Sequence, residues 1–202
     1  MLKVGLTGGI AVGKSVVGEM FVRLGAHLIQ ADQISHQLMQ PGQPVHQEVV
    51  RHFGPGILNS DQTVNRPKLA EAAFSGRIQE LNQIVHPAVL KKQKEWMDEI
   101  GQRDPHAIAI VEAALILEAG SARDFDQLIV VTCRPEQRVQ RWAHRMKVDE
   151  NTARHEVNRR MAAQLSDEEK IKAADYMIDN SGSLDETQKQ VNEIFGKLKQ
   201  EA

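Results

Sequence analysis

Five short apolar runs alternate with stretches of helical periodicity along this chain, and polar or turn-forming residues separate them. Strands that alternate with helices predict a parallel sheet covered on both faces, with right-handed crossovers between its strands. We therefore predict an α/β fold built on a five-stranded parallel sheet. The predicted strands are residues 2–6, 27–31, 107–111, 128–132 and 176–178.

Two long stretches of the chain lack strand signals and are predicted to be helical. In residues 33–105, helix-like patterns are interrupted by Pro-Gly and Gly-Pro pairs and by His86-Pro87, which predicts a helical insertion with a break at each interruption. A second helical excursion is predicted over residues 135–172. The chain is then expected to close with an amphipathic helix over residues 184–199.

The segment between the first predicted strand and the first predicted helix carries the chain's most specific motif. Residues 8–15 read Gly-Gly-Ile-Ala-Val-Gly-Lys-Ser, a complete match to Gly-x4-Gly-Lys-[Ser/Thr]. In this P-loop, the backbone N–H groups and the positive end of the following helix bind phosphate oxygens. Lys14 is expected to reach the β- and γ-phosphates, and Ser15 to ligate Mg²⁺.

Composition limits the remaining classes of function. The formal net charge of −2 and the pI of about 6.5 do not favour a nucleic-acid partner. No apolar run approaches the roughly 20 residues that span a bilayer, and no signal-peptide pattern opens the sequence, so we expect no membrane partner and a cytoplasmic location. The single cysteine, Cys133, ends an apolar run and is expected in the core.

Two carboxylates are predicted at the carboxyl ends of strands, where parallel α/β sheets bind their ligands. Asp32 follows the second strand, and is a candidate general base for an attacking hydroxyl or a helix N-cap, two roles that are compatible. Glu112 ends the third strand. It could contact Mg²⁺, a metal-bound water or the substrate, or have a structural role, and the residues alone leave these alternatives open.

Arginines are concentrated in the second helical excursion. Arg138, Arg141 and Arg145 stand at i, i+3 and i+7, which predicts one arginine face of a helix, while Val139, Trp142 and Met146 define an apolar face. Such a face can be a plain solvated surface. It can also be a lid that closes over nucleotide phosphates and stabilises the charge on the transferring phosphoryl group.

Other classes of P-loop protein fit the sequence less well. The chain has no Asn-Lys-x-Asp to read guanine, and no apolar strand ending in Asp-Glu, since Asp167-Glu168-Glu169 reads as the start of a helix. The histidines form no zinc-binding pattern. A small-molecule kinase is favoured.

The chain resembles the dephospho-coenzyme A kinase family almost from end to end. The shared segments are short, and their order and spacing together are specific. They are residues 5–10 leading into the P-loop, 31–36 (Ala-Asp-Gln-Ile-Ser-His), 41–44, 53–54, 66–69 (Arg-Pro-Lys-Leu), 86–87 (His-Pro), 125–126, 135–136, Arg141, Arg145, 160–164 and 174–180.

The resemblance implies ATP and Mg²⁺ as cofactors and dephospho-CoA as the substrate, phosphorylated on its ribose 3′-hydroxyl in the last step of coenzyme A synthesis. By matching position, it implies that Asp32 is the catalytic base and that Lys14, Arg141 and Arg145 assist catalysis. The implied nucleotide-binding residues are Gly8, Gly9, Ile10, Ala11, Val12, Gly13, Lys14, Ser15 and Val16. The implied substrate-binding residues are Asp32, His36, Arg66, His86, Leu115 and Glu118.

The resemblance also implies that the chain is organised in three parts. These are a nucleotide-binding core (1–34, 106–134 and 173–202), a helical CoA-binding region (35–105) and an arginine-bearing lid (135–172). The alternatives are another small-molecule P-loop kinase, for a nucleoside or nucleotide, and a regulatory ATP-binding protein.

Several positions depart from the family pattern. The usual Gly-Ser before Gly-Lys-Ser is Ala11-Val12 here, and the usual threonine after Ser15 is Val16. The motif positions survive, so phosphate binding is expected to survive too. Neither Ala11 nor Val12 adopts a positive φ as cheaply as glycine, so these two positions are the first place to look for an altered backbone path or ATP affinity. Asn65 and the segment 114–118 also depart, in the region implied to bind CoA.

Overall fold

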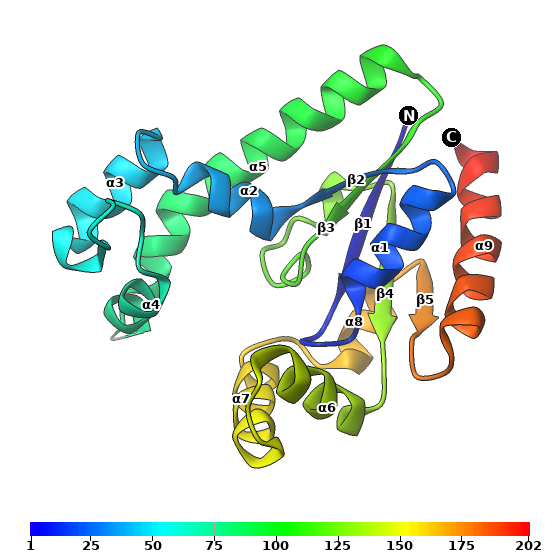
Figure 1. Ribbon diagram of the computed structural model, residues 1–202. Helices are drawn as coiled ribbons and strands as arrows, with labels where there is room; N and C mark the ends of the chain where they lie inside the picture. The colour runs from blue at the N-terminus through cyan, green and yellow to red at the C-terminus, as the bar shows by residue number, and fades with distance from the viewer. Residues whose placement is uncertain (75) are drawn as a thin grey trace. The chain divides into compact units, whose positions relative to one another are not determined.

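The computed structural model describes residues 1–74 and 76–202 and contains a five-stranded sheet in the order β2-β3-β1-β4-β5 (Figure 1). β1 pairs in parallel with β3 and β4, and β4 pairs in parallel with β5. The predicted fold class is therefore confirmed. The strands are β1 (Leu2–Gly8), β2 (His27–Gln30), β3 (Ile108–Glu112), β4 (Gln127–Thr132) and β5 (Tyr176–Asp179).

Helices fill most of the chain between these strands. The α-helices are α1 (Lys14–Arg23), α2 (Ala31–Leu38), α3 (Pro44–Phe53), α4 (Arg66–Phe74), α5 (Ile78–Arg103), α6 (Pro135–Met146), α7 (Glu150–Ala162), α8 (Asp167–Ala173) and α9 (Leu184–Glu201). The described residues also form the short 3₁₀ helices η1 (Pro55–Ile57) and η2 (Ala122–Asp124). The expected closing helix is confirmed as α9.

The strand order determines where ligand-binding residues gather. β1 lies in the middle of the sheet, with β3 on one side and β4 on the other. All five residues of β3 are buried, as expected for an apolar strand covered on both faces. Because the strands are parallel, the residues that follow β1, β3 and β4 share one edge of the sheet.

The main hydrophobic core lies between the sheet and the pair α1 and α9, which pack side by side (Figure 1). The rings of Phe21 on α1 and Phe195 on α9 have centroids 6.4 Å apart. Gly25, just beyond α1, has φ 104°, as expected for a glycine that ends a helix in the left-handed conformation. The chain then returns to the sheet at β2.

Cys133 belongs to this core, as predicted. Burial raises the pKa of its thiol, although Arg141 and Arg138 oppose the shift. The thiol is therefore protonated at neutral pH, which does not suit a nucleophile.

The chain divides into two compact units, residues 1–29 with 99–202, and residues 30–98. The second unit contains α2, α3, η1, α4 and most of α5. Within it, Nε2 of His46 on α3 hydrogen-bonds the carbonyl oxygen of Gln62 at 2.9 Å. The Arg77 guanidinium lies 4.6 Å from the ring centroid of Phe53 and donates to Glu80 at 3.0 Å. These contacts tie the short helices together.

The predicted break at His86-Pro87 is wrong. α5 runs without interruption from Ile78 to Arg103, and Pro87 lies inside it. Proline removes one hydrogen bond from a helix interior, to the carbonyl four residues earlier. The apolar positions Val85, Val89, Met97 and Ile100 are buried along the same helix, and this packing outweighs the local cost.

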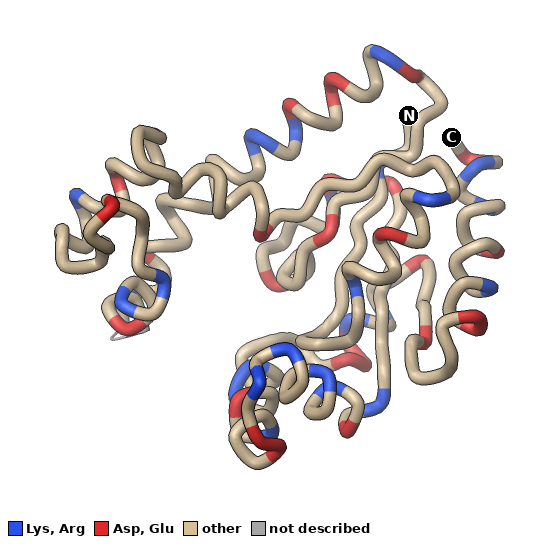
Figure 2. The backbone as a smooth tube through the Cα atoms, in the orientation of Figure 1, with Lys and Arg blue, Asp and Glu red and all other residues tan. Residues whose placement is uncertain are grey.

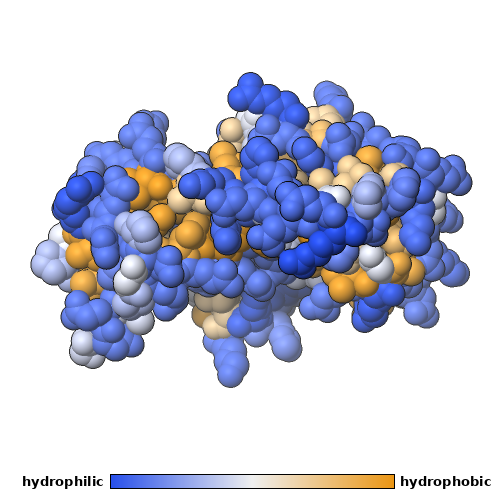
Figure 3. All heavy atoms as spheres, turned by 90° about the horizontal axis from the view of Figure 1, so that it is seen from above, coloured by the Kyte–Doolittle hydropathy of each residue, from blue (hydrophilic) through white to orange (hydrophobic). Residues whose placement is uncertain are grey.

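Hydrophilic residues cover most of the face drawn in Figure 3, and hydrophobic ones form separate patches between them. Within the described ranges, no helix has the length and the apolar composition that crossing a membrane would require.

Candidate functional site

The P-loop joins the end of β1 to the start of α1, as the motif predicts. Gly8 has φ 149° and Gly13 has φ 95°, and Gly13 is the N-cap of α1. A Cβ at Gly8 would collide with the carbonyl oxygen of Val131, and one at Gly13 would collide with Nδ2 of Asn180. Both motif glycines are therefore required by conformation and by close packing.

The two departures in the loop are accommodated in different ways. Ala11 adopts φ 56°, a left-handed conformation that costs a non-glycine residue about 1–2 kcal/mol. Val12 instead buries its side chain completely in the main core. Its carbonyl oxygen accepts hydrogen bonds from Nδ2 of Asn180 at 2.8 Å and from Nη1 of Arg141 at 3.0 Å. Two hydrogen bonds to one carbonyl oxygen thus fix the loop at Val12.

Lys14 and Ser15 lie at the start of α1, where the helix end favours anions. Nζ of Lys14 donates to the carbonyl oxygens of Gly8 and Gly9, each at 3.0 Å. The Ser15 hydroxyl donates to Oε1 of Glu112 at 2.8 Å, and Glu112 is the last residue of β3 and only 8% exposed. The strand-end rule thus identified a carboxylate that contacts the P-loop serine.

The oxygen atoms of Ser15 and Glu112 suit Mg²⁺, which prefers hard oxygen ligands and usually binds through one or two protein groups together with substrate phosphates. The described part of the chain contains no group of three or more His, Cys, Asp or Glu residues arranged to hold a metal ion. The two oxygen donors of Ser15 and Glu112 fit a metal ion carried in with a nucleotide.

The predicted arginine face of α6 needs correction. Arg138 is only 1% exposed and forms an ion pair with Asp167, whereas the expected apolar residue Met146 is 51% exposed. The i, i+3, i+7 spacing places residues on one side of a helix, but it does not say which part of that side packs on the protein. Val139 and Trp142 are buried, as predicted.

Arg141 and Arg145 lie farther along α6, in a region where Figure 2 shows Lys and Arg gathered over α6 and α7. Arg141 is half-buried, and besides the Val12 carbonyl it binds the carbonyl oxygen of Asn180 at 2.8 Å. The Arg145 guanidinium is exposed and lies 4.7 Å from the ring centroid of Trp142, as does that of Arg160. Arg141 thus couples the predicted lid directly to the P-loop.

A groove of about 650 Å³ lies between α6 and α7 and is lined by Trp142, Met146, His155, Glu156 and Arg160 among others. The Glu156 carboxylate in its wall accepts hydrogen bonds from Arg159 at 2.8 and 2.9 Å and from Arg160 at 2.7 Å. The Arg159 hydrogen bonds, with help from Arg160, lower the pKa of Glu156 from 4.5 to about 2, although partial burial opposes the shift.

We expect Glu156→Gln to lower the free energy of unfolding by about 0.5–1 kcal/mol at neutral pH, the range for a partly exposed ion pair. The pKa of the folded state lies below that of the unfolded state, so the stabilisation is present above about pH 4.5 and is lost as the pH falls toward 2. Urea unfolding at neutral pH and near pH 2 measures this difference. Glu193→Gln on the exposed face of α9 is the control. A difference that persists near pH 2 contradicts the prediction.

The remaining candidates fall in different places. Asp32 is exposed in the first turn of α2. The interpretation of Asp32 as the helix N-cap is wrong, because α2 begins earlier than predicted and Gln30 is its N-cap. Arg66, in the same compact unit, has its pKa lowered by burial, and the negative charge of Asp32 opposes this shift. His36 is exposed on α2 and His86 is half-buried on α5.

Leu115 and Glu118 lie in the segment after β3, where Leu115 is 41% exposed. The Glu118 carboxylate is engaged within the protein. It forms an ion pair with Lys170 at 2.8 Å and accepts a hydrogen bond from the backbone N–H of Leu165 at 3.0 Å.

Two residues of this region were missed. Asn180 directly follows β5, and the strand-end rule could have found it, since its amide holds the P-loop through Val12. Lys170 gave no such signal, because a lysine in a helix that begins Asp-Glu-Glu resembles a solvated charge.

A family model described as dephospho-CoA kinase matches residues 2–186 of the chain. A dephospho-CoA kinase from Aquifex aeolicus is 38% identical over 200 residues, which cover 98% of this chain and 98% of that protein. A crystal structure of a protein from Thermus thermophilus has a TM-score of 0.80 and 27% identity, covering 98% of this chain and 97% of that one. Dephospho-CoA kinase from Campylobacter jejuni shares the fold, with a TM-score of 0.70, 23% identity and coverage of 98% and 97%.

Proposed function

Since the chain belongs to the dephospho-CoA kinase family, we propose that it transfers the γ-phosphoryl group of ATP to the ribose 3′-hydroxyl of dephospho-CoA. The observation that carries this proposal is the P-loop, which keeps both motif glycines, Lys14 and Ser15 in a phosphate-binding arrangement despite Ala11 and Val12. The phosphorylated product is coenzyme A. We place the reaction in the cytoplasm, where ATP is available.

In this mechanism the P-loop backbone and the N-terminus of α1 hold the nucleotide phosphates, and Lys14 neutralises charge on the β- and γ-phosphates. Ser15 and Glu112 would hold Mg²⁺, directly or through water. Bound there, the metal ion would neutralise phosphate charge. Asp32 accepts the proton of the attacking hydroxyl, which is the role of a general base.

Arg141 and Arg145 are assigned to the lid, over residues 135–172. Arginine suits this role because its planar guanidinium binds phosphate oxygens in a bidentate manner. Arg141 is the better placed of the two, since it already donates to the carbonyl of Val12 in the P-loop. Closure of such a lid excludes water from the transferring group.

The helical region 35–105 is assigned to the CoA substrate, and residues 1–34, 106–134 and 173–202 are assigned to the nucleotide-binding core. Asp32, His36, Arg66, His86 and Leu115 are its proposed contacts. Arg66 supports this assignment, because its guanidinium can bind a phosphate group of the ligand and its charge interacts with that of Asp32. Glu118 is left out of this set, because Lys170 and Leu165 already engage its carboxylate.

The proposal is tested by incubating the protein with ATP and a panel of acceptors: dephospho-CoA, nucleosides and nucleoside monophosphates. We expect kcat/KM for dephospho-CoA to exceed that for every other acceptor by about a hundredfold or more, the discrimination that a site of matched polar groups can give. A nucleoside or nucleotide used equally well would favour the other small-molecule kinases. ATP binding without transfer to any acceptor would favour a regulatory ATP-binding protein.

A further inference from the structure

Two fully buried cations lie behind the P-loop, outside the groups that the proposed mechanism uses. Arg138 on α6 is 1% exposed, and the side chain of Lys170 on α8 is 0% exposed. Burying a charge is costly unless a partner compensates for it. Each of these cations has one carboxylate partner, and the partners belong to different segments of the chain.

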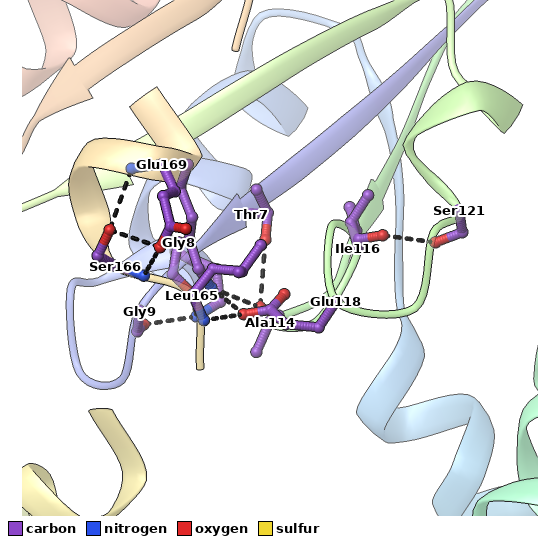
Figure 4. Close-up of polar contacts among 12 residues, drawn as sticks. Thr7, Gly8, Gly9, Ala114, Ile116, Glu118, Ser121, Leu165, Ser166 and Glu169 are labelled. Atoms are coloured by element: carbon purple, nitrogen blue, oxygen red, sulfur yellow. Dashed lines mark hydrogen bonds and ion pairs between the residues drawn. The ribbon is translucent and has the colours of Figure 1, made fainter. Parts of the chain in front are cut away.

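Lys170 connects α8 to the segment after β3 and, through it, to the end of β1. Its Nζ donates to the carbonyl oxygen of Ala114 at 3.2 Å and lies 2.8 Å from Oε1 of Glu118. The same Ala114 carbonyl accepts from the hydroxyl of Thr7 at 3.3 Å, and Thr7 directly precedes the P-loop. Figure 4 shows Thr7, Ala114, Glu118 and Leu165 meeting beside Gly8 and Gly9.

Arg138 makes the second connection, from α6 to α8 beside Gly9 of the loop. Its guanidinium forms an ion pair with Asp167, the first residue of α8. A Cβ at Gly9 would lie only 2.8 Å from Nη1 of Arg138 and 3.5 Å from Oδ1 of Asp167, so the pair packs directly against this loop residue. Gly9 therefore keeps the loop close to the ion pair.

Two of the charged residues of α8, Asp167 and Lys170, thus form ion pairs with residues outside this helix. Asp167 pairs with Arg138 beside Gly9, inside the loop. Lys170 pairs with Glu118 and is linked through the Ala114 carbonyl to Thr7, just before the loop. The capping box of Ser166 and Glu169 holds the first turn of this short helix. Because α8 is fixed through both Asp167 and Lys170, it restricts the first half of the P-loop. Arg141 and Asn180 restrict the second half through their hydrogen bonds to the carbonyl oxygen of Val12.

We infer that Lys170 and Arg138 are positioning residues, buried cations whose ion pairs with Glu118 and Asp167 hold the P-loop in its ATP-binding conformation. Neither cation is proposed to contact the nucleotide. They act through Ala114, Thr7 and Gly9, and the expected consequence of losing one of them is weaker ATP binding. The inference rests on the proposed function only in taking ATP as the ligand of the loop.

The test is the dissociation constant of ATP, measured directly by calorimetry in the full chain without any acceptor, together with Tm. Lys170→Met is expected to weaken ATP binding by about tenfold or more and to lower Tm, because Glu118 keeps a partly buried charge without its partner. Glu118→Gln keeps the shape of the acceptor and is expected to weaken binding by about threefold. Lys94→Met, which removes an exposed ion pair with Asp98 on α5, is the matched control and should leave both quantities unchanged.

A double variant separates positioning from stability alone. Lys170→Met with Glu118→Leu replaces the buried pair by apolar groups, and such replacements often restore stability. We expect its Tm to recover toward that of the wild type while ATP binding stays weak, because Ala114 still lacks its lysine donor. Recovery of ATP affinity together with Tm would overturn the inference, as would wild-type affinity in folded Lys170→Met or in Glu118→Gln. Failure of the wild type itself to bind ATP would contradict the proposed function instead.

Discussion

Replacing Asp32 by asparagine is expected to lower kcat by about 10²-fold or more while ATP affinity changes by no more than a few-fold, as for the loss of a general base. Asparagine keeps the size and hydrogen-bonding shape of the side chain, but it cannot accept the proton of the ribose hydroxyl. Steady-state kinetics with ATP and dephospho-CoA, with each substrate varied in turn, measure the effect.

The position of Asp32 in the first turn of α2 gives a competing explanation, because a carboxylate there stabilises a helix by about 0.3–1 kcal/mol. A purely helix-stabilising role predicts a lower Tm with unchanged kcat, and that result would remove Asp32 from the mechanism. Glu48→Gln, on an exposed part of α3, is the matched control and should affect neither quantity.

Lys14→Met is the second change for which we expect a large effect. Its Nζ is held by the carbonyl oxygens of Gly8 and Gly9 at 3.0 Å, in the loop that we propose binds phosphate. Removing this charge should lower kcat/KM for ATP by about 10²–10³-fold, the loss typical for one preorganised group that stabilises transition-state charge.

Methionine matches the length of lysine, so the variant tests the charge and not the packing. Lys92→Met, which breaks only an exposed ion pair on α5, is its control. If Lys14→Met retains kcat/KM for ATP within about threefold, Lys14 does not neutralise phosphate charge in the way proposed here.

The sequence predicted those parts of the fold and the site that depend on local pattern. The five strands, the P-loop and the carboxylate at the end of β3 follow from apolar runs and a short motif, and Glu112 indeed contacts Ser15. Asn180 obeys the same strand-end rule. These features need no knowledge of how distant segments pack.

The sequence-based predictions failed where contacts between segments distant in sequence determine the structure. Arg138 has the spacing of a surface arginine, but its partner Asp167 lies on another helix, and only the tertiary structure shows that Arg138 is buried and paired with it. Lys170 binds the carbonyl of a residue 56 positions away. Pro87 is a helix breaker by local rule, but the buried face of α5 holds the helix together across it.

Ala11 shows how packing overrides conformational preference. Its left-handed backbone is unfavourable for an alanine, and the sequence marked this position as the place where the loop could take a different path. The neighbouring Val12 is buried in the core, and its carbonyl is held by Asn180 and Arg141. These contacts fix the backbone of the loop at Val12, so the neighbouring Ala11 stays in an unfavourable left-handed conformation.

The central claim is that this chain phosphorylates the ribose 3′-hydroxyl of dephospho-CoA. The most direct measurement is the identity of the product, obtained by chromatography and mass spectrometry after incubation with ATP, Mg²⁺ and dephospho-CoA. We predict that dephospho-CoA is converted to coenzyme A, with one ADP released for each acceptor consumed. Release of ADP that does not depend on the acceptor, with dephospho-CoA recovered unchanged, would contradict the claim.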